Sequence, residues 1–355
     1  TSEYLNLFLN GTIGFYEGYL EQFGENAYNI LNRFELDLNY VNVNESYMYA
    51  PYFLGELPKG DFTSISDLYI KPKNDNSEYS FLYYKISNKD NLIENLYKFI
   101  NLRNVMTIRN ETAYKQFYEF EDNYREFVYD TYVGIPAEKF QRLEEIELGV
   151  PKAHDIKSMV EVVQMVTKYL ATNTSYTLEP GPLPKDKDYI EYFLLDSKKG
   201  YCAHYASAAV MLLRYYGVPA RYVEGYIVTN NDIYHGSVGG DTVYQIYDGD
   251  GNERAYRTTK TTVEIHDTNA HSWVEIYLDG VGWIPIEVTA GYSSNGISSL
   301  NNSIQNEVSN IPSTTPMPTN TPKPTLTEKP EITPTNTPAP TVSISPTKPE
   351  SSQTP

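Results

Sequence analysis

The feature that most constrains this chain is its only cysteine, Cys202, which opens a segment with strong helical character. Alanine, leucine and methionine are frequent in the following positions up to Tyr216, and these residues favour helices. Gly217 followed by Pro219 is typical of a helix end. The sequence therefore predicts a helix that begins at Cys202. A thiol in the first turn lies near unpaired backbone N–H groups and the positive end of the helix dipole, which both favour the thiolate.

Cys202 admits two interpretations. A free cysteine is among the most frequently buried residue types, which gives a structural interpretation. Cys202 stands at the entrance of the predicted helix, however, rather than in its apolar middle. Gly200, two residues earlier, lets backbone or substrate approach closely. The position favours a nucleophile.

A cysteine nucleophile needs a base within hydrogen-bond reach and a third group that orients the base. His204 is close in sequence, but two residues along a helix are a rotation of about 200°, so we expect a surface or packing role for it. His154 precedes a helix and His235 lies in a loop rich in polar residues and glycine, so neither shows a partner pattern. His271 does show one, because it lies in a predicted strand that is followed closely by another.

The two predicted strands, residues 270–277 and 283–288, form a hairpin. If Tyr277 pairs with Val281 across a three-residue loop, His271 faces Glu287 directly, with Cβ atoms about 4.5–5.5 Å apart. The same register collects aliphatic residues on one face of the hairpin. The hypothesis is a triad of Cys202, His271 and Glu287.

Two alternatives to this triad remain open. A two-residue turn at Asp279 and Gly280 would shift the pairing by one, set Val288 opposite His271 and send side chains to the other face. A purely structural pair of His271 and Glu287 would also look the same in the sequence.

Charge and composition exclude several classes of function. The chain carries 46 acidic against 28 basic residues, a net charge of −18, which makes nucleic acid a poor partner. One cysteine forms no internal disulfide, and one cysteine with scattered histidines offers no zinc spacing, so we expect no metal and no cofactor. No window approaches 18 consecutive apolar residues, so we expect no transmembrane helix in the chain itself. It begins with threonine and lacks a signal peptide, which suggests a segment of something longer.

The pattern changes along the chain. Residues 19–34 predict a helix, and short aromatic runs between 47 and 86 predict the strands of a small β-rich region. Helical spacing recurs at 92–100, at 113–129, and at 156–170, where apolar residues mark an amphipathic face. We interpret residues 111–142 as a connector that Pro136 breaks. From 311 onward the chain is mostly Pro, Thr and Ser and holds 12 of the 22 prolines, which predicts a disordered, extended spacer.

Several blocks of sequence closely resemble the motifs of the transglutaminase-like superfamily. They are Gly200–Ala208, Gly217–Tyr226, and His271–Tyr277 followed by Gly282–Thr289. The resemblance covers roughly residues 156–292. It implies an α+β, papain-like core in which a helix carrying Cys202 packs on an antiparallel sheet, with His271 as base. Glu287 stands where the family usually carries Asp.

The resemblance also sets the expected organisation and function. We expect an N-terminal α+β domain at 1–140, rich in strands and of unknown role, a catalytic domain at 141–300 and a disordered linker at 301–355. The implied reaction is acyl transfer through a thioester on protein or peptide carboxamides. A cysteine peptidase or amidase of the same fold, or a non-catalytic binding module, are the alternatives. The arrangement resembles bacterial members held at the extracellular face of the membrane by segments outside this chain, with a substrate possibly associated with the cell wall.

Overall fold

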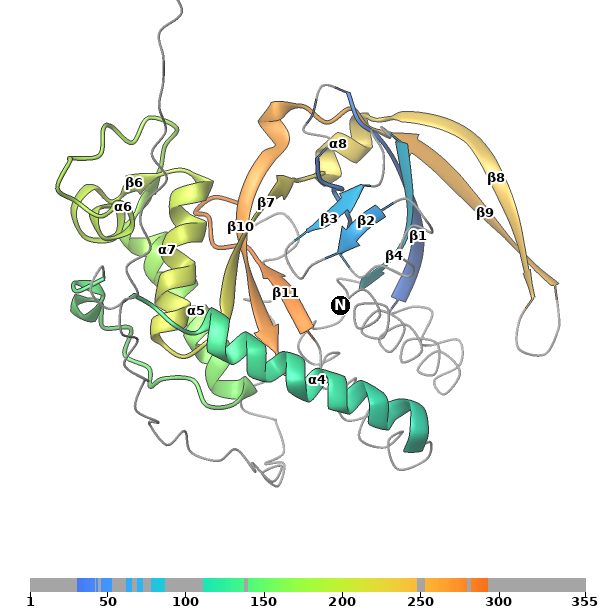
Figure 1. Cartoon of the computed structure of the whole chain (residues 1–355). Coiled ribbons are helices and arrows are strands. Elements are labelled where there is room, and N and C mark those ends of the chain that lie inside the picture. The colour runs from blue at the N-terminus through green and yellow to red at the C-terminus, as the bar shows by residue number, and fades with distance from the viewer. Residues whose placement is uncertain are drawn as a thin grey trace, which may run out of the picture. The chain divides into compact units, whose positions relative to one another are not determined.

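The computed structural model describes residues 31–41, 43, 46–52, 62–65, 69–72, 78–86, 111–136, 140–247, 253–279 and 282–292 (Figure 1). The chain divides into two units, Thr1–Ile311 and Pro312–Pro355, and every described residue belongs to the first. The helix predicted at 92–100 and the linker predicted at 301–355 lie outside the described residues. The domain boundaries at 140 and 300 stay predictions.

The N-terminal part of the described chain is built from short antiparallel pairs. Strand β1 (Leu31–Asn39) pairs with β4 (Glu78–Ile86), and β2 (Phe62–Ile65) pairs with β3 (Ile70–Pro72). The helix predicted over 19–34 is wrong at its C-terminal end, because β1 already begins at Leu31. Alternation explains the strand, since Leu36 and Leu38 pack towards a small core while Glu35 and Asp37 are exposed.

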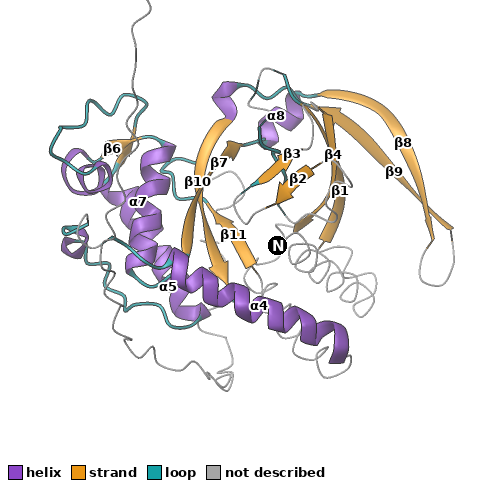
Figure 2. Cartoon of the chain, viewed as in Figure 1, coloured by secondary structure: helices purple, strands orange, loops and turns teal. Residues whose placement is uncertain are grey.

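A three-stranded antiparallel sheet carries the candidate site. Its order is β11 (Gly282–Ile286), β10 (Ala270–Leu278), β7 (Ala220–Tyr226), with β10 in the middle. Helix α7 (Cys202–Tyr215) packs on one face of this sheet, and α5 (Ile156–Asn173) packs against α7 (Figure 2). The α+β class predicted from the sequence is therefore confirmed, as is the packing of the cysteine-bearing helix on an antiparallel sheet.

Period-two alternation sorts the residues of β10 between its two faces. The face towards α7 is aliphatic and belongs to the main core, with Val274, Ile276 and Leu278 fully buried. Helix α5 closes this core with the amphipathic face expected from the sequence. Its buried members are Met159, Val160, Val162, Val163, Val166 and Leu170. The core thus fixes α7 against the sheet, and with it the position of Cys202.

The opposite face of the sheet is aromatic and polar, and α4 (Glu111–Tyr132) covers it. The Tyr277 hydroxyl donates to Glu121 at 3.1 Å, and the Trp283 indole N–H donates to the Tyr124 hydroxyl at 2.8 Å. Val128 is fully buried in the same cluster. The interpretation of this stretch as a connector is wrong, because α4 supplies the second layer over the sheet.

The register of the β10–β11 hairpin differs from both predicted registers. Leu278 pairs with Gly282, so Val274 lies opposite Ile286 rather than Ile284. The three-residue loop length is as predicted, but the loop lies one residue later in the chain. Gly282 explains the position, because its φ of 108° lies in the region that favours glycine and marks the end of the loop. The pairing is shifted by two, an even number, so every side chain keeps its predicted face.

A long two-stranded ribbon separates β7 from β10 in the sequence. It consists of β8 (Ser237–Tyr247) and β9 (Glu253–Thr262), which pair antiparallel, and it follows the short helix α8 (Asn230–His235). None of the helices in the described ranges has the length and apolar character that a bilayer-spanning segment requires. The remaining elements are short: η1 (Leu143–Glu145), β5 (Ser175–Tyr176), α6 (Tyr189–Glu191), η2 (Tyr192–Ser197), β6 (Lys199–Gly200) and η3 (Asp267–Asn269).

Candidate active site

Cys202 is the first residue of α7 and is half-buried. The backbone N–H of Tyr201, the residue before it, donates to Nδ1 of His204 at 3.3 Å, which fixes the entrance of the helix. Gly200 makes the approach possible, because a Cβ there would lie 2.6 Å from the Cβ of His204 and 2.9 Å from the ring of Phe193. The glycine expected to allow close approach therefore does so between β6 and α7.

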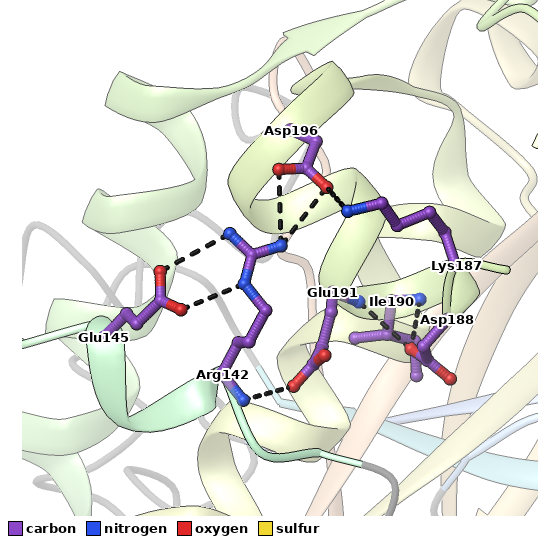
Figure 3. Close-up of polar contacts among 7 residues, drawn as sticks. All are labelled: Arg142, Glu145, Lys187, Asp188, Ile190, Glu191 and Asp196. Atoms are coloured by element: carbon purple, nitrogen blue, oxygen red, sulfur yellow. Dashed lines mark hydrogen bonds and ion pairs between the residues drawn. The ribbon is translucent and has the colours of Figure 1, made fainter. Parts of the chain in front are cut away.

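A network of charges holds the segment that leads to Cys202 (Figure 3). The Arg142 guanidinium pairs with Glu145 at 2.9 Å and with Asp196 at 3.2 Å, and Lys187 also pairs with Asp196 at 3.4 Å. The backbone N–H of Arg142 donates to the buried Glu191 carboxylate at 2.6 Å. These contacts anchor η2, a single π-helical turn of the kind often found beside functional sites.

His271 and Glu287 form a buried hydrogen-bonded pair. Nε2 of His271 lies 2.7 Å from Oε2 of Glu287, and both side chains are at most 5% exposed. The second carboxylate oxygen accepts the backbone N–H of Thr289 at 2.7 Å. Glu287 is therefore fixed at both oxygens. Glu287 directly follows the last residue of β11, Ile286. Its position after the strand accommodates the methylene by which its side chain exceeds that of Asp.

The thiol of Cys202 completes the arrangement. It is hydrogen-bonded to the His271 side chain, and Nδ1 is the ring nitrogen that Glu287 leaves for it. The structure thus brings Cys202, His271 and Glu287 together in the order nucleophile, base and orienting acid that cysteine chemistry requires. Their roles in catalysis stay predictions.

The pKa values of the two central groups shift towards a charged pair. Burial raises the pKa of the Cys202 thiol, but hydrogen bonds from His271 and Ser272 lower it by more than burial raises it. The pKa of the thiol is therefore below its ordinary value. Burial lowers the pKa of His271, but hydrogen bonds to Cys202 and Glu287 raise it to about 9. At neutral pH these shifts favour thiolate and imidazolium together.

Aromatic rings enclose the imidazole of His271. The ring of Tyr292 stacks on it with centroids 4.7 Å apart, and the ring of Trp273 lies parallel to it at 6.3 Å. Gly225 makes room for the indole, since a Cβ there would lie 2.7 Å from Trp273. Stacking limits rotation of the imidazole and so preserves its line between Cys202 and Glu287.

The other histidines lie apart from this pair. His204 is buried against the rings of Tyr189 and Phe193, at centroid distances of 4.6 and 5.4 Å, which confirms the expected packing role. His154 is exposed and lies beside Asp155, and His235 is exposed on α8. Asp196, six residues before Cys202, forms ion pairs with Arg142 and Lys187.

Sequence reasoning missed two residues beside the thiol. Ser272 hydrogen-bonds Cys202 through its backbone N–H and its side chain, and the Tyr222 hydroxyl lies 2.9 Å from the Ser272 hydroxyl. The position of Ser272 directly after His271 was a signal. The pairing of β7 with β10, which brings Tyr222 there, has no local signature in the sequence.

Comparison with known proteins agrees with this geometry. Residues 150–288 match the sequence model of the transglutaminase-like superfamily, and this part of the chain belongs to that superfamily. The matched range contains Cys202, His271 and Glu287.

Two curated bacterial proteins are similar to the chain. The uncharacterized protein YebA of Bacillus subtilis (strain 168) is 32% identical over 201 residues, which are 56% of this chain and 22% of YebA. A protein-glutamine gamma-glutamyltransferase of Pseudomonas aeruginosa is 32% identical over 115 residues, 32% of this chain and 13% of that protein. The chain therefore spans less than a quarter of the length of either relative.

One solved structure that is similar to this chain is the periplasmic domain of TgpA from Pseudomonas aeruginosa. It aligns with a TM-score of 0.40 at 15% sequence identity, over 78% of this chain and 74% of that one.

Proposed function

We propose that this domain transfers acyl groups from protein or peptide carboxamides through a thioester on Cys202. The observation that carries the proposal is the hydrogen-bonded line from Cys202 through His271 to Glu287, with the pKa of the thiol lowered and that of the imidazole raised. A papain-like arrangement of helix and sheet accounts for this line. The gamma-glutamyltransferase named among the relatives supports a glutamine side chain as the acyl donor.

The first half of the reaction forms the thioester. The Cys202 thiolate attacks the carboxamide carbon, and the carbonyl oxygen becomes an oxyanion. The first N–H groups of α7, which have no partner within the helix, are suited to stabilise that oxyanion. When the carbon–nitrogen bond breaks, the His271 imidazolium gives its proton to the departing nitrogen, which leaves as ammonia or an amine.

The second half resolves the thioester. A primary amine attacks the acyl carbon, the now neutral His271 accepts the amine proton, and the carbon–sulfur bond breaks to restore the thiolate. Glu287 holds the imidazole in the tautomer that both steps require and stabilises its charged form. Water in place of the amine would make the same site an amidase or peptidase.

The test is incubation with a library of glutamine-containing peptides, with and without a primary amine, read by mass. Incorporation of the amine supports the transferase, and a cleaved or deamidated peptide would assign the site to hydrolysis. Cys202→Ala should abolish either reaction, while His154→Ala, at an exposed histidine apart from the site, should leave it intact. If the unsubstituted protein yields neither an amine adduct nor a cleaved or deamidated peptide, the result would favour a non-catalytic binding module.

We also propose the location. The domain lies at the extracellular face of a bacterial cell, tethered by segments outside this chain, and acts on proteins or peptides there, including those of the cell wall. Likeness to a periplasmic domain and the match to two bacterial proteins support this location.

A further inference from the structure

The sulfur of Cys202 has a second hydrogen-bonding neighbour besides His271. Ser272 directs both its backbone N–H and its hydroxyl at the thiol. Ser272 is 5% exposed and sits on the face of β10 that turns towards α7, opposite to the face of His271. The two consecutive residues therefore reach the sulfur from the two faces of one strand.

Two residues of the neighbouring strand extend this contact to solvent. The Tyr222 hydroxyl lies 2.9 Å from the Ser272 hydroxyl and donates to Oε1 of Glu224 at 2.6 Å. In the pairing of β7 with β10, Ser272 lies opposite Glu224, and Tyr222 lies opposite Val274, so all of them share the face towards α7. A chain of polar groups thus runs from the sulfur to an exposed carboxylate.

A count of protons shows that the hydrogen bonds among these polar groups have two possible arrangements. Tyr222 and Ser272 each carry one hydroxyl proton. In the first arrangement Tyr222 donates to Glu224 and Ser272 donates to Tyr222, so Ser272 reaches the sulfur with its backbone N–H but not with its hydroxyl proton. In the second, Tyr222 donates to Ser272, and Ser272 donates to the sulfur. Only rotation of the two hydroxyls separates them.

The charge of the sulfur decides between these arrangements. A thiolate is a charged acceptor and forms stronger hydrogen bonds than a neutral group, so it favours the second arrangement. A thioester sulfur carries no charge, and the carboxylate of Glu224 then offers the better acceptor, which favours the first. The hydroxyls would therefore turn when Cys202 is acylated and turn back when it is released.

We propose that Ser272 is a further catalytic residue that donates its hydroxyl proton in a hydrogen bond to the Cys202 thiolate, and that Tyr222 and Glu224 position it. This assignment deepens the proposed thioester reaction and rests on it. The Ser272 hydroxyl stabilises the attacking thiolate and no longer donates to the sulfur once the acyl group is attached. Glu224 competes for the donors and so limits how far the thiolate is stabilised.

The other groups that face the thiol are neutral hydroxyls. Tyr176 and Tyr189 interact electrostatically with Cys202, and burial raises the pKa of both hydroxyls, that of Tyr176 to about 12. Burial and the bond to Glu224 raise the pKa of Tyr222 to about 12 as well. These raised pKa values keep all three hydroxyls protonated near neutral pH.

The experiment measures the rate of Cys202 alkylation by iodoacetamide as a function of pH, which reports the thiolate without requiring acyl transfer. For Ser272→Ala we expect the rate at pH 6 to drop about tenfold, because a hydrogen bond to a charged acceptor is lost. Ser272→Thr keeps the hydroxyl and should restore most of the rate. An unchanged profile in Ser272→Ala would overturn the assignment, whether or not the protein proves to be an acyltransferase.

A second variant tests the positioning role and avoids the buried site. Glu224→Gln, at an exposed position, should raise the rate at pH 6 about threefold, because a neutral amide oxygen is a weaker acceptor for the Tyr222 hydroxyl than a carboxylate and because a nearby negative charge is removed. Glu144→Gln on η1 removes the same charge from another exposed position and should leave the rate unchanged.

Combining the substitutions separates the two effects of Glu224. The charge acts on the thiolate directly and is screened by salt, whereas the hydroxyl chain acts only through Ser272. We expect the effect of Glu224→Gln to shrink in the Ser272→Ala background. An equal effect of Glu224→Gln in both backgrounds would overturn the positioning role of Tyr222 and Glu224.

Discussion

Individual residues of the site differ in how firmly the fold holds them. Glu287 receives the imidazole at one oxygen and the Thr289 N–H at the other, and the ring of His271 is stacked against Tyr292. Cys202 is held by its place at the start of α7 and by the hydrogen bonds of His271 and Ser272 to its thiol. Glu287 and His271 are thus each held by two contacts of the side chain.

Replacement of Glu287 by Gln tests the role of its charge. The amide retains a hydrogen bond to His271 but no longer stabilises the imidazolium, so the pKa of His271 should fall from about 9 towards its ordinary value. We expect kcat/KM for amine incorporation to decrease roughly 100-fold. NMR titration of the imidazole gives the pKa. Glu287→Asp, which keeps the charge, is the matched control and should lose much less activity.

The pH dependence of acylation follows from the same shift. His271 keeps its proton as pH rises until about 9, and the departing nitrogen needs that proton. The rate of acylation should therefore rise as Cys202 ionises below its ordinary pKa, stay level through neutral pH and fall above about 9. Single-turnover release of ammonia from a glutamine peptide measures it. A fall that begins near pH 6.5 would contradict the raised pKa of the imidazole.

Secondary-structure elements position the site through close packing at glycines. Gly200 in β6 has a φ outside the positive range, so a substitution there meets a steric obstacle only. For Gly200→Ala we expect a loss of about 1–3 kcal/mol in the free energy of unfolding, because the new methyl would overlap His204 and Phe193. Urea denaturation measures it.

Gly134 provides the control for this substitution. A Cβ at Gly134 meets nothing within 4 Å, so Gly134→Ala should leave the free energy of unfolding within about 0.5 kcal/mol of the parent protein. Equal effects of the two substitutions would show that overlap with α7 is not the cause.

At the scale of elements, the sequence predicted what periodicity encodes. The bounds of α7, the buried face of α5 and the sorting of β10 into two faces follow from local spacing. Two features do not follow from local spacing. The hairpin register depends on loop geometry, and the signal was Gly282, whose positive φ ends the loop. The partnership of β7 with β10 joins distant segments, so Tyr222 could not be assigned to the site in advance.

For the molecule as a whole, polar contacts tie the N-terminal residues to the sheet that carries His271. The Tyr52 hydroxyl accepts the indole N–H of Trp273 at 2.6 Å and donates to Glu275, which also pairs with Arg221. The Arg221 guanidinium in turn lies 4.1 Å from the centre of the Trp283 ring. These contacts join residues on the two sides of the predicted boundary at 140, which stays a prediction.

Tyr52→Phe tests whether this tie stabilises the molecule. The substitution leaves the Trp273 N–H and the Glu275 carboxylate each short of one partner. We expect the free energy of unfolding in urea to fall by about 1–3 kcal/mol. Tyr47→Phe, at an exposed ring, is the matched control and should change it by less than about 0.5 kcal/mol. No difference between the two variants would argue that the N-terminal residues fold without help from the sheet.

The neighbouring strands β7 and β10 end beside each other, since Tyr226 pairs with Ala270. The described residues between them, 227–247 and 253–269, lie outside this sheet, and the chain returns to the place where it left the sheet. A tight turn would close the same gap, so the architecture of the sheet sets no limit on the length of this detour. A longer or shorter segment between Tyr226 and Ala270 is therefore compatible with the same pairing of β7 and β10, and with the same position of His271.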